Sequence, residues 1–276
     1  MITLTPQQLN AICESYKNGE SVLALSKKYK CSPHTIKNRL DKMSAGKVSQ
    51  AKRLNPTFVE DYFENIDSKE KAYWIGWLLT DGGISSDNNN IQMSLQKQDE
   101  YILRLLESDL CISNHISPHH EDYVRFSLGS KKMVKDLSQY GIIPNKTLTL
   151  KFPSNISSEF DSSLLRGMFE GDGGLTVGIA TRFYKHRNKS YTRPYQELSF
   201  TGTYDMCEGF QNMLLKHIEI PRKNVKHNHS IYRVRWSNKE EIIKILDFLY
   251  ADCEKHCLTR KYNLYQRLKY TKEETA

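Results

Sequence analysis

The stretch WIGWLLTDGGI at residues 74–84 decides the fold of this chain, because its pattern returns at residues 165–175 as LRGMFEGDGGL. In both copies a glycine stands five residues before an aspartate, and two further glycines follow the aspartate directly. The two aspartates are Asp81 and Asp172. A motif of this length that recurs in the same order indicates an internal duplication.

The flanks of the two copies also correspond. VRFS at 124–127 is matched by VRWS at 234–237, and a helix-like segment follows each, at 131–137 and 240–246. Each copy predicts the order helix, two strands, helix, two strands, helix. Alternating apolar and polar residues place the strands near 83–96 and 113–128 in the first copy, and near 174–201 and 223–236 in the second.

The helices predicted before the aspartates, at 72–80 and 162–171, are mostly apolar and should be buried. A glycine inside a helix costs roughly 1 kcal/mol relative to alanine, so Gly76 and Gly167 are better explained by close contact between the two helices. We also expect a glycine after each aspartate to adopt a positive φ angle.

Contact between these helices would bring both aspartates together at helix C-termini, where the helix dipole is already negative. Two carboxylates in that position require a compensating cation. The pattern therefore predicts a divalent-metal site.

With these residues the chain resembles the LAGLIDADG homing endonucleases in their single-chain, two-motif form, over about residues 57–276. The motif copies are WIGWLLTDG and LRGMFEGDG, whose sixth position, often acidic in the family, is Leu79 in one copy and Glu170 in the other. The resemblance implies an α+β fold of two pseudo-symmetric αββαββα repeats, residues 57–155 and 156–276, that form a DNA-binding saddle.

The resemblance also implies an activity, the hydrolysis of one phosphodiester in each strand of a long, asymmetric DNA site by a monomer. Asp81 and Asp172 would bind two or more Mg²⁺ ions, helped by the backbone carbonyls of Thr80 and Gly171. The ions would polarise the scissile phosphate and stabilise the attacking water and the leaving oxygen.

Family members also place a lysine near each centre to offset negative charge. The matching candidates are Lys146 and Lys261, one in each repeat. Lys97 is a weaker candidate for a water-ordering residue, and its counterpart in the second repeat would be Gly202. For each lysine the alternative is an exposed, solvated side chain.

Composition agrees with a polyanionic partner. The 276 residues include 40 Lys and Arg against 32 Asp and Glu, which gives a net charge of +8. The sequence has neither a membrane-spanning apolar run nor a secretory signal, so we expect a cytoplasmic protein. The first 45 residues, described below, favour a bacterial or phage gene.

The six cysteines are spaced irregularly, which does not indicate a disulfide framework. Cys253, His256 and Cys257 raise the question of zinc, but no second cysteine pair matches them. Because residues 252–265 have an amphipathic helical pattern, we interpret the cysteines as core residues and do not expect zinc.

The first 45 residues predict three short helices. One starts at Thr5-Pro6 with a capping box, one after Ser21, and one after Ser32. They resemble the helix-turn-helix of recombinases and resolvases, in which the third helix enters the major groove. That helix carries the candidate DNA contacts His34, Lys37, Asn38 and Arg39. A small protein-interaction domain is the alternative, and residues 46–56 form the expected linker.

Alternate side chains of antiparallel strands can face the bases in the major groove. In the first repeat the candidate contacts are Gln92, Ser94, Gln96 and Arg125. In the second repeat they are Arg182, Tyr184, Lys185, Arg187, Lys189, Arg193, Tyr195, His227, His229, Arg233 and Arg235. A solvated basic hairpin is the alternative for residues 182–195, and we expect more phosphate neutralisation on the second half.

Two other functions stay open at this point. One is a DNA-binding transcription regulator without catalysis on the same scaffold, which the two intact aspartate motifs argue against. The other is an intron maturase, whose partner would include RNA.

Overall fold

The structure is a computed structural model that describes residues 4–43, 57–184, 186 and 188–270. The whole of the predicted linker at 46–56, together with Lys185 and Arg187, lies outside the described residues. Among the helices described, none is both long and apolar enough to cross a membrane.

Three helices form the N-terminal segment: α1 (Pro6–Lys17), α2 (Val22–Lys28) and α3 (Pro33–Lys42). The predicted caps are confirmed, since the side chains of Thr5, Ser21 and Ser32 each accept a backbone N–H of the first helical turn. The helices bury a small core of their own, formed by Leu4, Ile12, Cys13, Leu25, Ile36 and Leu40.

The first antiparallel sheet has the strand order β1-β2-β4-β3. Its strands are β1 (Gly82–Ile84), β2 (Asn90–Gln96), β3 (Ile116–Pro118) and β4 (Tyr123–Gly129). The helices of this half are α5 (Lys69–Leu79), α6 (Glu100–Asp109) and α7 (Lys131–Ser138), and the short 3₁₀ turn η1 (Lys97–Asp99) precedes α6. Ile91, Met93 and Leu95 of β2 are buried and the residues between them are not, as the alternation predicts.

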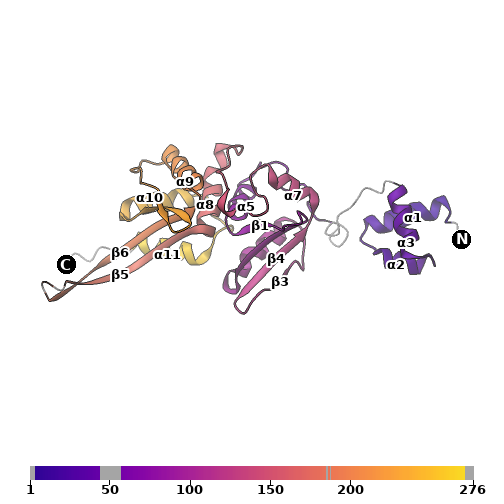
Figure 1. Cartoon of the computed structure of the whole chain (residues 1–276), viewed down its shortest axis with the longest axis horizontal. Helices are drawn as coiled ribbons and strands as arrows, with labels where there is room; N and C mark the ends of the chain where they lie inside the picture. The colour runs from indigo at the N-terminus through magenta and orange to yellow at the C-terminus, as the bar shows by residue number, and fades with distance from the viewer. Residues whose placement is uncertain (1–3, 44–56, 185, 187, 271–276) are drawn as a thin grey trace.

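The second sheet has the equivalent order, β5-β6-β8-β7. Its strands are β5 (Gly173–Tyr184), β6 (Lys189–Gly202), β7 (Lys226–Asn228) and β8 (Ile231–Trp236). The helices are α8 (Asp161–Asp172), α9 (Tyr204–His217), α10 (Lys239–Leu249) and α11 (Thr259–Tyr270). Two short turns, η2 (Lys146–Leu148) and η3 (Ser158–Phe160), lie in the connection between the halves. Figure 1 shows the two halves side by side, with β5 and β6 projecting as a long hairpin.

Both halves share one hydrophobic core. The buried cluster runs from Phe58 to Leu268 and includes residues of α5 and α8 together with one side of each sheet. Helices α5 and α8 lie next to each other at its centre, and each leads directly into the first strand of its sheet. The ends of these two helices therefore hold the aspartates where the two halves meet.

Two local expectations are wrong. The glycines after the aspartates do not adopt positive φ, because Gly82 and Gly173 instead begin strands β1 and β5. The helix expected at 252–265 begins only at Thr259, so Cys253 and Cys257 lie in the connection between α10 and α11. Between the two cysteines the chain follows bends instead of a helix.

Candidate active site

Helices α5 and α8 approach each other so closely that only glycine fits at their crossing. A Cβ atom on Gly76 would overlap the Leu164 carbonyl oxygen and lie 2.7 Å from the Met168 nitrogen. One on Gly167 would overlap the Tyr73 carbonyl oxygen. The obstacles are backbone atoms of the opposite helix, which cannot rotate away. The predicted glycine-mediated contact is confirmed.

The two helix ends also touch. A Cβ on Gly171 would overlap the side chain of Thr80, the residue directly after α5. The Thr80 hydroxyl is held in place, because it donates to the carbonyls of Gly76 and Trp77, each at 3.1 Å. Asp81 and Asp172 are the next residues along the chain from this contact, so the fold brings the two carboxylates to one place.

Both carboxylates reach solvent, yet many protein atoms surround them. This crowding is the main cause that raises the pKa of Asp172, to about 6, and the charge of Asp81 adds to it. Burial also raises the pKa of Asp81. A bound cation would stabilise the negative charges of these two carboxylates at the C-terminal ends of the helices.

Two buried lysines lie beside the pair, and their arrangement in the two halves is alike. The Lys146 ammonium donates to the carbonyls of Thr80, at 3.3 Å, and Gly82, at 2.7 Å, on either side of Asp81. The Lys261 ammonium donates to the carbonyls of Phe169, at 2.7 Å, Glu170, at 2.8 Å, and Gly173. Each lysine thus donates to carbonyls at or just beyond the C-terminal end of α5 or α8.

Burial lowers the pKa of both lysines, that of Lys261 to about 8. The negative charges of Asp81 and Asp172 act in the opposite direction on each. Both aspartates therefore lie within electrostatic range of both ammonium groups. The structure places these two predicted residues at the aspartates, and the alternative of exposed, solvated side chains does not apply to them.

The other residues predicted from the motifs do not belong to this cluster of aspartates and lysines. Lys97 is exposed at the start of η1, and Gly202, its expected counterpart, ends β6. The sixth motif positions point into the core, since Leu79 and Glu170 are both buried and the Tyr73 hydroxyl donates to Glu170 at 2.6 Å. Neither sixth position is part of the exposed carboxylate pair.

Steric crowding explains why a glycine directly follows each aspartate. A Cβ on Gly82 would lie 2.6 Å from the Leu78 Cα, and one on Gly173 would lie 2.9 Å from the Phe169 Cα. The strand folds back over the last turn of its own helix at both places. Gly83, in contrast, has nothing within 4 Å of a Cβ position.

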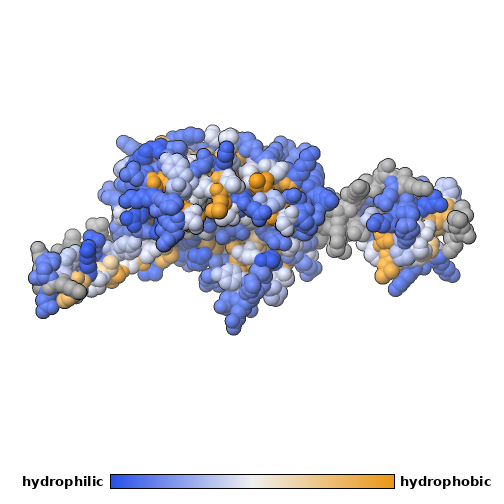
Figure 2. Space-filling model, viewed as in Figure 1, coloured by the Kyte–Doolittle hydropathy of each residue, from blue (hydrophilic) through white to orange (hydrophobic). Residues whose placement is uncertain are grey.

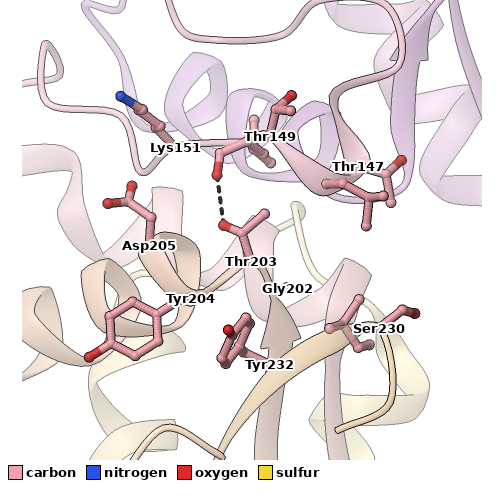
Figure 3. A pocket seen from close by; sticks show the side chains of 12 residues that line it. Thr147, Thr149, Lys151, Gly202, Thr203, Tyr204, Asp205, Ser230 and Tyr232 are labelled. Carbon is pink, nitrogen blue, oxygen red and sulfur yellow. Dashed lines mark hydrogen bonds between the residues drawn. The ribbon is translucent and has the colours of Figure 1, made fainter. Parts of the chain in front are cut away.

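A hydroxyl-lined cleft leads away from Asp172. A pocket of about 140 Å³ is lined by Asp172, Thr80 and Lys146. It shares Thr203 and other residues with a pocket of about 340 Å³, where Tyr204 and Tyr232 line the wall (Figure 3). Figure 3 shows the Thr203 hydroxyl bonded to the connection between the halves, where it donates to the Leu150 carbonyl at 2.6 Å.

Sequence reasoning did not find this cleft. Its residues come from the connection between the halves, the β6–α9 junction and the β7–β8 turn, which no motif joins. The one local signal was Thr203, a hydroxyl residue directly before α9 that caps its first turn.

Most of the strand residues predicted to contact DNA share the face opposite the helices. In the first sheet the register pairs Gln92 with Ser127, Ser94 with Arg125 and Gln96 with Tyr123, between the buried pairs. The Arg125 guanidinium donates to the Ser94 hydroxyl at 3.0 Å. In the second sheet the residues on the corresponding face are Arg182, Tyr184, Lys189, Arg193, Tyr195, Arg233 and Arg235.

The histidines of the second sheet lie elsewhere. His227 pairs with Tyr232, so it projects from the other side of the sheet, and His229 lies in the β7–β8 turn. His227 nevertheless lines a pocket of about 380 Å³ together with Lys226, Arg233 and Arg235. This pocket at the sheet edge is predominantly basic.

The N-terminal candidates are exposed on α3. The side chains of His34 and Asn38 are hydrogen-bonded to each other at 3.0 Å, and Lys37 and Arg39 are both solvent-accessible. Their contact with DNA stays a prediction.

Cys253 and Cys257 are half-buried against the hydrophobic core, and both are free thiols. The His256 imidazole is hydrogen-bonded to Asp109 at 2.7 Å. Over the described ranges, no group of three or more His, Cys, Asp or Glu residues is arranged to hold a metal ion.

Solved structures resemble this one, although no family model matches the chain and a search of curated proteins found no match. The LAGLIDADG meganuclease I-AabMI bound to uncleaved DNA superposes with a TM-score of 0.51 at 15% identity, over 71% of this chain and 88% of that chain. The meganuclease I-SmaMI bound to uncleaveable DNA with a TTCT central four superposes with a TM-score of 0.52 at 11% identity, over 73% of this chain and 90% of that chain. The LAGLIDADG homing endonuclease I-LtrWI bound to target DNA superposes with a TM-score of 0.50 at 11% identity, over 77% of this chain and 92% of that chain.

At these identities the likeness concerns the fold. The mixed α+β structure with two antiparallel four-stranded sheets is the fold of LAGLIDADG meganucleases.

Proposed function

We propose that this chain is a divalent-metal-dependent endonuclease that cuts both strands of a specific double-stranded DNA site. The observation that carries the proposal is the pair Asp81 and Asp172, set on touching helix ends and flanked by the buried Lys146 and Lys261. The similarity of the fold to meganucleases whose structures contain DNA supports the same function.

The donor set fits Mg²⁺. This ion binds proteins through one or two carboxylates and completes its coordination with water and substrate phosphate, so a site with two acids at a solvent-open position is sufficient. Asp81 and Asp172 would hold the ions, and the carbonyl of Gly171 remains a candidate ligand. The Thr80 carbonyl already accepts the Lys146 ammonium at 3.3 Å, which makes it a weaker ligand than the resemblance implied. When bound, the metal would polarise the scissile phosphate and lower the pKa of a nucleophilic water.

The protein's own residues would act by position and charge. The glycine contact between α5 and α8 fixes the separation of the carboxylates, which a double-strand cut requires. Lys146 and Lys261 neutralise the helix ends and place positive charge near the phosphate. Because each ammonium is held by backbone carbonyls, it is preorganised and costs little reorganisation during the reaction.

We assign DNA binding to the outer faces of both sheets. Strands β1 and β5 begin directly after the aspartates, so each sheet leads from the candidate active site outward along a duplex. A two-stranded ribbon fits the major groove, where base edges differ. The N-terminal helices are proposed as a second DNA contact, joined through the linker, and the two halves are proposed to derive from one duplicated unit.

The test is a selection of cleaved sites from a randomised DNA library, with intact protein and Mg²⁺. A nuclease yields duplexes with a defined sequence cut in both strands, and EDTA abolishes their recovery. Enrichment of a bound sequence with no cut in Mg²⁺ or Mn²⁺ would reject catalysis and leave a DNA-binding regulator.

A further inference from the structure

The hairpin of β5 and β6 extends far beyond its sheet. The two strands pair continuously from Gly173 opposite Phe200 to Tyr184 opposite Lys189. Strand β8 pairs with β6 only between Leu198 and Gly202. The remaining segments, 176–184 and 189–197, form a two-stranded arm, visible in Figure 1 as the projecting end of β5 and β6.

The first half has no such arm. Strand β1 contains three residues, Gly82–Ile84, and every residue of β2 pairs with β4. At a rise of about 3.3 Å per residue, the nine residues of each arm strand add roughly 30 Å on the second half alone. The two halves thus share their strand order but differ in how far their first two strands extend.

The arm has two chemically different faces. Residues directly opposite each other in the ladder share a face, and neighbours along a strand alternate. One face, here called the basic face, carries every described ionisable residue of the two arm strands: Arg182, Tyr184, Lys189, Tyr191, Arg193, Tyr195 and Glu197. The other face carries Val177, Ile179, Thr181, Phe183, Ser190, Thr192, Pro194 and Gln196 and has no charge.

The basic face continues the outer face of the sheet. Ser199 pairs with Arg235, and Thr201 with Arg233, so both arginines lie in line with the arm's charges. On the opposite side the sheet buries Leu198 and Phe200 against the helices. The charges therefore lie on the side that faces away from the protein core.

The side chains on the basic face support each other. The Arg182 guanidinium lies 5.2 Å from the Tyr184 ring centre, and the rings of Tyr184 and Tyr191 meet edge to face at 5.5 Å. At the root of the arm, Glu197 binds Arg233 at 2.8 Å and accepts the Tyr195 hydroxyl at 3.1 Å. The outer part of the arm has no such acid, so its cations are available to phosphates. Figure 2 shows hydrophilic residues along this projection, with a few hydrophobic ones among them.

We infer that the arm binds DNA beyond the cleaved segment on one side only. Recognition would extend about nine base pairs further from the cut on the side of the second half, since base pairs along one strand are about 3.4 Å apart. The inference rests on the proposed function for its partner, double-stranded DNA. It goes beyond that function because it assigns an asymmetric footprint to a named structural element.

The test compares two double variants in the full-length protein. Arg182→Gln with Arg193→Gln changes the basic face, and Thr181→Ala with Thr192→Ala changes the other face one residue away in each strand. Duplexes with 40 randomised base pairs are selected for binding without divalent metal and sequenced. The best duplex is then footprinted with hydroxyl radicals and titrated at several salt concentrations.

We expect the wild-type footprint to reach about nine base pairs further on one side. The arginine variant should lose sequence preference in that outer segment, and its slope of log affinity against log salt should become shallower by about one to two. The threonine variant should keep the wild-type sequence preference in the outer segment and the wild-type salt dependence. A symmetric wild-type footprint, or an unchanged outer segment in the arginine variant, would overturn the inference.

Cleavage of the selected duplex in Mg²⁺ is scored separately. Asymmetric binding without cleavage rejects the nuclease function and leaves the arm's role intact. Cleavage with a symmetric footprint rejects the arm's role alone. A failure to select any duplex rejects both.

Discussion

Asp172 bears a charge that the metal-free fold disfavours. Crowding and the charge of Asp81 raise its pKa from 3.8 to about 6. Because the folded state binds this proton more tightly than the unfolded state does, the associated stability is complete below about pH 4 and is lost as the pH rises through 6. Removing the charge should therefore stabilise the protein at neutral pH.

We predict that Asp172→Asn raises the melting temperature of the metal-free protein at pH 7 by about 2–4 °C. This corresponds to on the order of 1 kcal/mol, because solvent screens an exposed carboxylate. At pH 4 the difference should nearly vanish, and Mg²⁺ should stabilise the wild type more than the variant. Melting curves at both pH values check this, and an equal gain at pH 4 and pH 7 would contradict it.

Lys261 stabilises the fold, in addition to any role in catalysis. Its ammonium donates to the carbonyls of Phe169 and Glu170 in the last turn of α8 and of Gly173 just beyond it, so Lys261→Met would remove these hydrogen bonds. We predict a loss of about 2–4 kcal/mol in the free energy of unfolding, part of the cost being offset by removal of a buried charge. Chemical denaturation measures it. The control is Lys97→Met at an exposed site, and equal stability of the two variants would refute the role.

At the scale of elements, the α5–α8 contact determines whether the site exists. Gly76→Ala introduces a Cβ that overlaps the backbone of α8, while Gly83→Ala meets nothing within 4 Å. We predict that the first change lowers the free energy of unfolding by about 3 kcal/mol and the second by less than about 1 kcal/mol. Calorimetry on both variants tests this. Similar stability in the two variants would mean that the helices do not meet through this glycine.

The helices and their contact could be predicted because the responsible residues are local. A glycine within an apolar helical pattern indicates close contact with another helix. The duplicated aspartates indicated which helix ends converge. The caps Thr5, Ser21 and Ser32 were predictable for the same reason, since capping depends on residues within one turn.

Other features depend on partners far away in the chain. The glycines after the aspartates were expected in a helix-ending conformation, but space over the preceding helix, rather than φ, explains Gly82 and Gly173. The length of the β5–β6 arm follows from where β8 stops pairing, which alternation within β6 does not reveal. The cleft beside Asp172 combines three connections, and no single segment carries its pattern.

At the scale of the whole molecule, DNA affinity should have separable contributions. The N-terminal helices bury their own core, so their removal leaves the main core intact. We predict that deletion of residues 1–45 weakens DNA binding and flattens its salt dependence while cleavage persists. Titrations of the selected duplex at several salt concentrations measure the effect. Unchanged affinity in the truncated protein would show that these helices are not a DNA contact.

The most direct test of the account is cleavage of the selected duplex by Asp81→Asn and Asp172→Asn in Mg²⁺, with binding measured on the same DNA. Because each aspartate is assigned to the shared metal site, each variant should bind within about threefold of wild type and produce no double-strand break. A full double-strand break by either variant, at the rate of the wild type, would contradict the assignment of the aspartate pair as the catalytic centre.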